Sequence, residues 1–318
     1  MSKLGSVPVR SSRWIRSHLF TRFLGALVPL LARLSPRAWS FFAWILTPIV
    51  WKCMRKKRLQ TIANLQNVLN LDLEDAKRIG RASFHSNLLV LFESLALQRL
   101  LDQDGVVVEA EITPQAAKLI EDLKTGKIKS ALALSGHSGV WEFVGAYLAC
   151  LVLPAPTIVA SKLPRSPVSA KFLKDIRAGY GLTLVNKNQI ARQFLKQQQD
   201  ESSALTIFLC DQHFNREGAV RVPLLGKPAC TVGMPATIIQ KFGTPTIIGN
   251  CIRKKPGHYL IKIETLDVAG FGNLSPQQAH IAITARINEE LSGYIESAPE
   301  QWFWGHRRWR ECCSAKSD

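Results

Sequence analysis

The sequence predicts an α/β fold in which helices flank a mostly parallel β-sheet. Between residues 105 and 266, short apolar runs of strand length alternate with stretches that carry apolar residues at helical spacing. Glycines, prolines and helix-capping residues separate these stretches. The 318-residue chain is 47% hydrophobic and 20% charged, so a sizeable core can form. We therefore expect one α/β domain with its sheet covered on both faces, rather than two domains.

Local signals set the boundaries of the expected elements. Helix 113–126 is the clearest, because Thr113 is a favourable N-cap residue, Pro114 takes the first helical position and Gly126 ends the helix. The expected strands are 105–112, 130–135, 156–161, 182–186, 204–211 and 245–254, with 258–266 as the antiparallel partner of the last. The other expected helices are 139–152, 168–181, 189–199, 233–243 and about 276–297. Upstream, leucines and isoleucines at helical spacing predict helical structure over roughly 58–100.

The N-terminal region is basic and rich in tryptophan. Residues 1–71 hold twelve of the 41 Lys and Arg residues, four of the eight Trp residues and no Asp or Glu. Basic segments bind phosphate on nucleic acids or on membranes, but this one also contains the apolar runs 19–31 and 38–58. Apolar, Trp-rich stretches flanked by Arg and Lys are typical of a bilayer interface, and we expect no nucleic-acid partner. The basic cluster 52–58 (KCMRKKR) would then meet anionic headgroups.

The region 1–57 is therefore predicted to be helical and membrane-associated, ahead of a catalytic domain at 58–310 and a tail at 311–318. Its longest uncharged run, 38–51, is shorter than the roughly 20 residues of a membrane-spanning helix. We expect a peripheral or interfacial location, with a single span as the alternative. A second alternative is that these helices belong to the core of the domain. No signal peptide is expected, because no clean apolar core precedes a cleavage site.

The seven cysteines include no C-x-x-C pair, which fits a reducing compartment better than a disulfide framework or a zinc site. Four of them lie in apolar runs and are expected to be inert core residues: Cys150, Cys210, Cys230 and Cys251. The histidines are scattered through the chain as well, so no metal site is expected.

The most informative short motif is SGHSGVWE, residues 135–142. His137 follows strand 130–135, at the edge where open α/β sheets place their chemistry, and Gly136 and Gly139 allow a tight turn. Glu142, in the first turn of the next helix, would orient the imidazole so that it acts as a general base toward a hydroxyl. The motif is not the G-x-S-x-G elbow of serine hydrolases, because Val140 replaces its last glycine. The alternative is structural, with the histidine capping the turn.

Together with other segments, this H-x-x-x-x-[DE] motif resembles that of the glycerolipid acyltransferase superfamily. The chain is most similar to one branch, the late acyltransferases of lipid A biosynthesis. FLCDQHFNREGAVRVPLLGKPACTVGMPA (208–236) resembles the D-Q block of that branch, and APEQWFWGHRRWR (298–310) is similar to its terminal P-E-Q-W segment. Segments 55–69 and 83–94 also resemble it, so the likeness runs from about residue 15 to 310.

The resemblance implies a glycerolipid acyltransferase-like fold and an O-acyltransferase at the cytoplasmic face of a bacterial inner membrane. Such an enzyme moves a fatty acyl chain from acyl carrier protein or coenzyme A to a hydroxyl of a lipid A precursor or related lipid. The acyl thioester is a co-substrate, and no further cofactor is implied. By the same resemblance His137 is the base and Glu142 its partner. A lipid esterase or thioesterase using the same two residues with water is the alternative.

The resemblance also suggests further site residues. Asp211, Gln212 and His213 would build the site, and Lys162 or Arg165 would bind acceptor phosphate or support the oxyanion. Lys162 stands where the family usually has arginine, and a lysine keeps the charge but loses the bidentate grip on phosphate. Four C-terminal residues are expected to line the membrane-facing or acceptor-facing mouth: Trp302, Trp304, Arg307 and Arg308. Packing of this segment on the sheet is the alternative.

Overall fold

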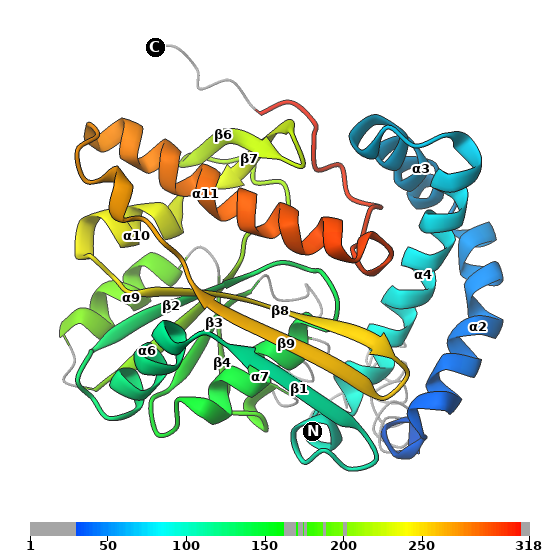
Figure 1. Ribbon diagram of the computed structural model, residues 1–318, viewed down its shortest axis with the longest axis horizontal. Coiled ribbons are helices and arrows are strands. Elements are labelled where there is room, and N and C mark those ends of the chain that lie inside the picture. The colour runs from blue at the N-terminus through cyan, green and yellow to red at the C-terminus, as the bar shows by residue number, and fades with distance from the viewer. Residues whose placement is uncertain are drawn as a thin grey trace, which may run out of the picture.

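The computed structural model describes residues 30–161, 170, 174, 177–186, 189–199 and 202–312 (Figure 1). Its centre is a seven-stranded sheet of order β1-β9-β8-β2-β5-β3-β4. The strands are β1 (Val107–Ile112), β2 (Ser130–Ser135), β3 (Thr157–Ser161), β4 (Leu182–Asn186), β5 (Ala204–Leu209), β8 (Thr246–Lys255) and β9 (His258–Thr265). Five neighbouring strands run parallel from β8 to β4, whereas β9 is antiparallel to β8 and β1 is parallel to β9. The predicted mostly parallel sheet and its antiparallel pair are confirmed.

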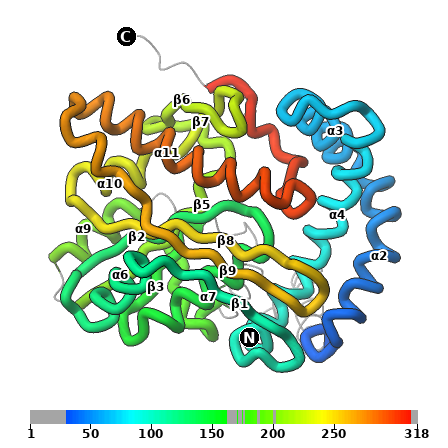
Figure 2. Tube along the Cα trace, viewed as in Figure 1, coloured from blue at the N-terminus to red at the C-terminus, as the bar shows by residue number. Residues whose placement is uncertain are grey.

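Helices cover both faces of this sheet, as predicted. Side chains alternate along β2, so Ala131 and Ala133 face the helices α5, α6 and α7, whereas Leu132 and Leu134 face α9, α10 and α11. Figure 2 shows α10 and α11 on one side of the central strands and α6 and α7 on the other. The helices of the domain are α5 (Leu97–Leu101), α6 (Pro114–Lys124), α7 (Trp141–Leu151), α9 (Ile190–Gln199), α10 (Met234–Phe242) and α11 (Pro276–Ser297). The expected helix 168–181 lies mostly outside the described residues.

The long helices that precede α5 in the described chain pack at one end of the sheet (Figure 1). They are α2 (Pro36–Cys53), α3 (Arg55–Leu69) and α4 (Leu73–Leu95). One side of α2 is buried against α4, where Trp39 and Ala43 join Leu89 and Phe92 in a small core. The other side of α2 exposes large apolar side chains, so only one face of this helix belongs to the core. In the part of the chain that the structure describes, no helix is long and apolar enough to cross a membrane.

A two-stranded hairpin that the sequence did not predict follows β5. Its strands are β6 (Ala219–Leu224) and β7 (Lys227–Val232), and β6 packs on α11. Pro223 and Pro228 lie opposite each other in it, and prolines argue against a strand inside a larger sheet. They are tolerated here because each strand of a two-stranded sheet has one edge without a hydrogen-bonding neighbour. Leu225 and Gly226, both with positive φ, form the turn.

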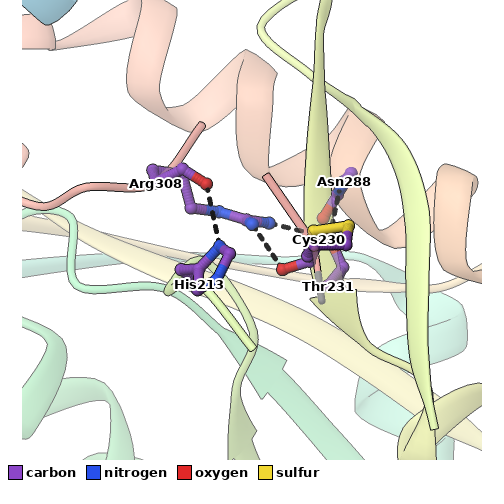
Figure 3. The surroundings of a disulfide bond; sticks show 6 residues. His213, Cys230, Thr231, Asn288 and Arg308 are labelled. Atoms are coloured by element: carbon purple, nitrogen blue, oxygen red, sulfur yellow. Dashed lines mark hydrogen bonds between the residues drawn. A yellow bond between two sulfur atoms is a disulfide. The ribbon is translucent and has the colours of Figure 1, made fainter. Parts of the chain in front are cut away.

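A disulfide joins Cys230 of β7 to Cys312 near the C-terminus (Figure 3), so the expectation of an inert Cys230 and of a chain without disulfides is wrong. The cysteines are 82 residues apart in sequence, and their spacing carries no signal of pairing. They meet because the segment that follows α11 runs back along the hairpin. On this segment, the guanidinium of Arg308 donates to the Cys230 carbonyl oxygen at 2.6 Å and to the Thr231 hydroxyl at 2.7 Å.

Candidate active site

Two titratable residues face each other at the carboxyl edge of the parallel sheet. Strands β2 and β5 are neighbours, and Ser135 at the end of β2 pairs with Leu209 at the end of β5. His137 and Asp211 each lie two residues beyond these ends. The parallel register therefore brings them to the same place, although 74 residues separate them in sequence. This edge is where α/β sheets of this kind bind their ligands.

The His137 ring and the Asp211 carboxylate form a tight pair. The ring Nδ1 lies 2.7 Å from Asp211 Oδ1, and the His137 backbone N–H donates to Oδ2 at 2.8 Å. The Trp302 indole N–H donates to the same Oδ2 at 2.7 Å, so both oxygens of this buried carboxylate are occupied. Because Nδ1 donates to the carboxylate, Nε2 of the neutral imidazole is the nitrogen that can accept a proton.

The surroundings shift the pKa values of both groups. Burial lowers the pKa of His137, but the negative charge and hydrogen bond of Asp211, together with the charge of Glu142, outweigh burial and raise it. Burial raises the pKa of Asp211, and the His137 charge and the hydrogen bonds from His137 and Trp302 reverse this and lower it. Asp211 is therefore held as a carboxylate that stabilises a protonated His137.

Two glycines make this close approach possible. A Cβ atom on Gly136 would lie 3.2 Å from the Cβ and Cγ of Asp211. Gly139 has a φ of +59°, and a Cβ there would lie 1.8 Å from the Cys251 carbonyl oxygen. That same oxygen accepts the Val140 backbone N–H at 2.8 Å, which fixes the turn against β8. The sequence argument that these glycines shape the turn is confirmed by these contacts.

Glu142 is in the first turn of α7, as expected, but it does not hold the imidazole. Its carboxylate forms a bidentate ion pair with Arg177, whose Nε donates at 3.1 Å and whose terminal N–H donates to the other oxygen. Both ring nitrogens of His137 have other partners, so the prediction that Glu142 orients this ring is wrong. Sequence reasoning missed Arg177, since nothing in the expected helix 168–181 distinguished it from other cations.

The residues next to Asp211 complete the polar side of the site. The Gln212 side-chain nitrogen lies 3.1 Å from His137 Nε2, and the tautomer of the ring makes Gln212 the donor. His213 Nδ1 donates to the Arg308 carbonyl oxygen at 3.4 Å. Asp211, Gln212 and His213 are thus brought together with His137, as the sequence predicted. Burial and the charges of Arg310 and Arg308 lower the pKa of His213, which favours its neutral form.

A cavity of about 390 Å³, which we call the His137 cavity, opens beside these groups. Its polar lining consists of His137, Glu142, Ser161, Arg177, Gln212 and His213. The rest of its lining is largely apolar and comes from β3, β4, β5, β7 and the neighbouring helices: Val159, Leu182, Ile190, Ile207, Phe208, Val232 and Met234. A cavity with apolar walls and a few polar groups at one end suits an apolar ligand with a reactive polar end.

Three of the four C-terminal residues expected to line a mouth are buried. Trp302 and Trp304 are 2% and 0% exposed and Arg308 is 0% exposed, so the prediction that they face membrane or acceptor is wrong. They are buried because the segment packs on the sheet, where Trp302 donates to Asp211 and Arg308 donates to β7. Arg307, between them, is exposed. Lys162 and Arg165 lie outside the described residues.

This fold and site define an α/β protein with a histidine–aspartate pair that can take a proton from a hydroxyl beside an apolar cavity. Residues 10–311 match the family described as bacterial lipid A biosynthesis acyltransferase. A search of curated proteins found no match. The chain belongs to the bacterial lipid A biosynthesis acyltransferases, which confirms the resemblance of the D-Q and P-E-Q-W segments. It is an acyltransferase, and its family implies an acyl thioester donor and a lipid acceptor.

Proposed function

We propose that the protein transfers a fatty acyl chain from an acyl thioester to a hydroxyl of a lipid A precursor, with His137 as the general base. The donor is acyl carrier protein or coenzyme A loaded with the chain. The observation that carries this proposal is the His137–Asp211 pair, because it leaves Nε2 of His137 as the proton acceptor and His137 lines a cavity that suits an acyl chain. Asp211 takes the partner role that the sequence alone gave to Glu142.

The chemistry balances without a cofactor. His137 Nε2 takes the proton of the acceptor hydroxyl, and the acceptor oxygen attacks the thioester carbonyl carbon. The carbon–sulfur bond then breaks, and the leaving thiolate takes the proton back from the imidazolium. Asp211 stabilises that imidazolium in between. Gln212, which donates to Nε2 in the free protein, must turn aside for the acceptor hydroxyl, and its amide can then donate to the oxyanion.

Glu142 and Arg177 have a different part in this proposal. Their bidentate ion pair lines the His137 cavity, and Glu142 holds the Arg177 guanidinium in place there. We assign this pair to positioning the acyl thioester, because its charges lie beside the base without touching it. Lys162 or Arg165 would bind acceptor phosphate or support the oxyanion, as the family resemblance suggests.

The protein is further proposed to bind the cytoplasmic face of the inner membrane peripherally, through the region 1–57. The outer face of α2 supports this, because its exposed side chains include Phe41 (57% exposed), Trp44 (68%) and Ile49 (54%). The basic cluster 52–58 follows the apolar face directly. Apolar side chains next to cations are the combination that binds an anionic bilayer surface.

The test is an assay with purified protein, a lipid A precursor and the same acyl chain on carrier protein or on coenzyme A. Mass spectrometry should show the lipid heavier by one acyl group, and His137→Ala should abolish this product. Free fatty acid released at the same rate with and without the lipid would instead identify a hydrolase and overturn the proposal. The donor with the higher kcat/KM identifies the acyl source.

A further inference from the structure

An open groove of about 600 Å³ lies apart from the His137 cavity, between α3 and the β6–β7 hairpin. Arg307, Trp309 and Arg310 of the C-terminal segment form its third wall. Figure 1 shows α3, the hairpin and this segment together at the top of the molecule. We call this site the basic groove.

Four exposed cations line the basic groove: Arg221, Lys227, Arg307 and Arg310. Within the described ranges of the chain, none of these four side chains makes a hydrogen bond or ion pair with another residue. No aspartate or glutamate is among the residues that line the groove. Like charges gathered without counter-charges repel one another, and an anionic ligand would relieve that repulsion. The groove therefore has the charge of an anion site.

The other residues that line the groove indicate which class of anion it suits. Asn67 and Gln60 of α3 present amides, which hydrogen-bond to hydroxyls, and Trp309 supplies an aromatic ring. The Trp309 indole N–H donates to the Leu224 carbonyl oxygen at 3.2 Å, so the ring is held in place. Arginine guanidinium groups grip phosphate with paired hydrogen bonds. Cations, amides and a fixed aromatic ring together suit a phosphorylated sugar.

The C-terminal segment connects the basic groove to the His137 cavity. Arg307 and Trp309 of the groove flank Arg308, whose side chain is buried. The Arg308 carbonyl oxygen accepts from His213, and His213 lines the His137 cavity. A ligand held in the groove therefore lies against the same segment that contacts the His137 cavity.

We propose that the basic groove binds the phosphate-bearing sugar headgroup of the lipid acceptor and so presents its hydroxyl to His137. This inference rests on the proposed function. An acidic carrier protein would also suit the charge, but a stable protein interface buries about 800 Å² on each partner. A concave groove of this volume matches a small ligand instead. The groove also shares α3 with the basic cluster 52–58, which we assign to the membrane surface.

The double variant Arg307→Gln/Arg310→Gln tests the proposal. In neutral detergent micelles, where the acceptor is the only lipid that carries phosphate, the KM of the variant for the lipid A precursor should rise roughly tenfold or more. Its kcat and its KM for the acyl donor should stay within about twofold of wild type. Acceptor treated with a phosphatase should bind wild type and variant equally weakly, because the lost contacts are to phosphate. The matched control is Lys124→Gln/Lys129→Gln, which removes two exposed cations elsewhere on the surface.

Each other result overturns the proposal. An unchanged acceptor KM would mean that the groove does not bind the headgroup. A raised KM for acyl carrier protein alone, with acyl coenzyme A unaffected, would assign the groove to the carrier. Loss of binding to phosphatidylglycerol vesicles with a normal micellar KM would assign it to bulk membrane lipid. If wild type transfers no acyl group, the proposed function fails, but the groove can still be tested by direct binding of the intact precursor. Weaker binding to the double variant than to wild type would then support the groove, and equal binding would overturn it.

Discussion

At the scale of the residue, the site contains two carboxylates with different surroundings. Asp211 is buried, touches the His137 ring and accepts from Trp302, whereas Glu142 is bound by Arg177. A carboxylate in contact with the imidazole fixes the tautomer and stabilises the charge that forms on the ring. A carboxylate that does not touch the imidazole, such as Glu142, affects the ring only through its electrostatic field. The two residues should therefore respond differently to the loss of their charge.

We predict that Asp211→Asn lowers kcat by about 10²–10⁴-fold, because the amide keeps the shape but no longer stabilises the imidazolium. Glu142→Gln should cost less, about tenfold, since its carboxylate does not touch the ring. Steady-state kinetics on both variants, with circular dichroism as the control for folding, measures the difference. Equal losses from the two substitutions would contradict the assignment of Asp211 as the partner of His137.

The pH dependence of the reaction gives a second prediction. The imidazole acts as a base only when neutral, so kcat/KM should fall as the pH drops through the raised pKa of His137. Glu142→Gln removes a negative charge that raises this pKa and leaves the positive charge of Arg177 uncompensated. Both effects lower the pKa of His137, so the acidic limb of the profile should move to lower pH. A limb that stays in place, or moves upward, would show that the field of Glu142 does not reach the base.

At the scale of the element, the turn between β2 and α7 positions the base. Gly139 takes a left-handed conformation and touches the backbone of β8, so this turn depends on one residue without a side chain. Gly293 of α11 is the natural comparison, because it has ordinary helical geometry and open space around it. The same substitution should therefore have opposite effects at the two positions.

We predict that Gly139→Ala destabilises the protein by at least about 2–4 kcal/mol, since a Cβ would meet the Cys251 carbonyl oxygen and the positive φ adds strain. Gly293→Ala should stabilise it by roughly 0.5–1 kcal/mol, because alanine has the higher helix propensity. Urea denaturation of both variants provides the free energies of unfolding. A Gly139→Ala protein as stable as wild type would mean that the turn relaxes easily and does not need glycine.

At the scale of the whole molecule, the N-terminal helices are fastened to the sheet on one side and free on the other. Glu93 of α4 forms a buried ion pair with Arg253 of β8, and Tyr259 of β9 donates to the same carboxylate at 2.9 Å. This network attaches α4 to the sheet, and α2 packs on α4. The outer face of α2 is left with its large apolar side chains exposed. The orientation of this face relative to the sheet is therefore fixed by the buried contacts beneath it.

We predict that the triple variant Phe41→Ser/Trp44→Ser/Ile49→Ser loses binding to anionic lipid vesicles, because burying each apolar side chain contributes about 1.5–3 kcal/mol. Vesicle flotation measures the bound fraction. The control Leu274→Ser/Ile281→Ser removes two exposed apolar side chains near the start of α11 and should float like wild type. If the triple variant still floats with the vesicles after a high-salt wash, the anchor lies elsewhere in the chain.

The sequence by itself determined the parts of this protein that depend on near neighbours. The Thr113 cap, the span of α11 and the place of His137 after β2 all follow from residues within one turn or one strand. The environment of the C-terminal tryptophans was predicted wrongly because local residues do not determine it. A tryptophan side chain suits a membrane-facing mouth and a buried core equally well. Only the position of neighbouring elements separates those two environments.

Only the tertiary structure decided which carboxylate meets the imidazole. Glu142 is five residues from His137 and Asp211 is 74 residues away, yet Asp211 makes the contact. The order of the strands is responsible, because β5 lies between β2 and β3 and its in-register pairing with β2 places Asp211 opposite His137. Strand order and the Cys230–Cys312 link depend on how distant segments bury their apolar faces together. This packing depends on the whole chain at once, so no local sequence pattern predicts it.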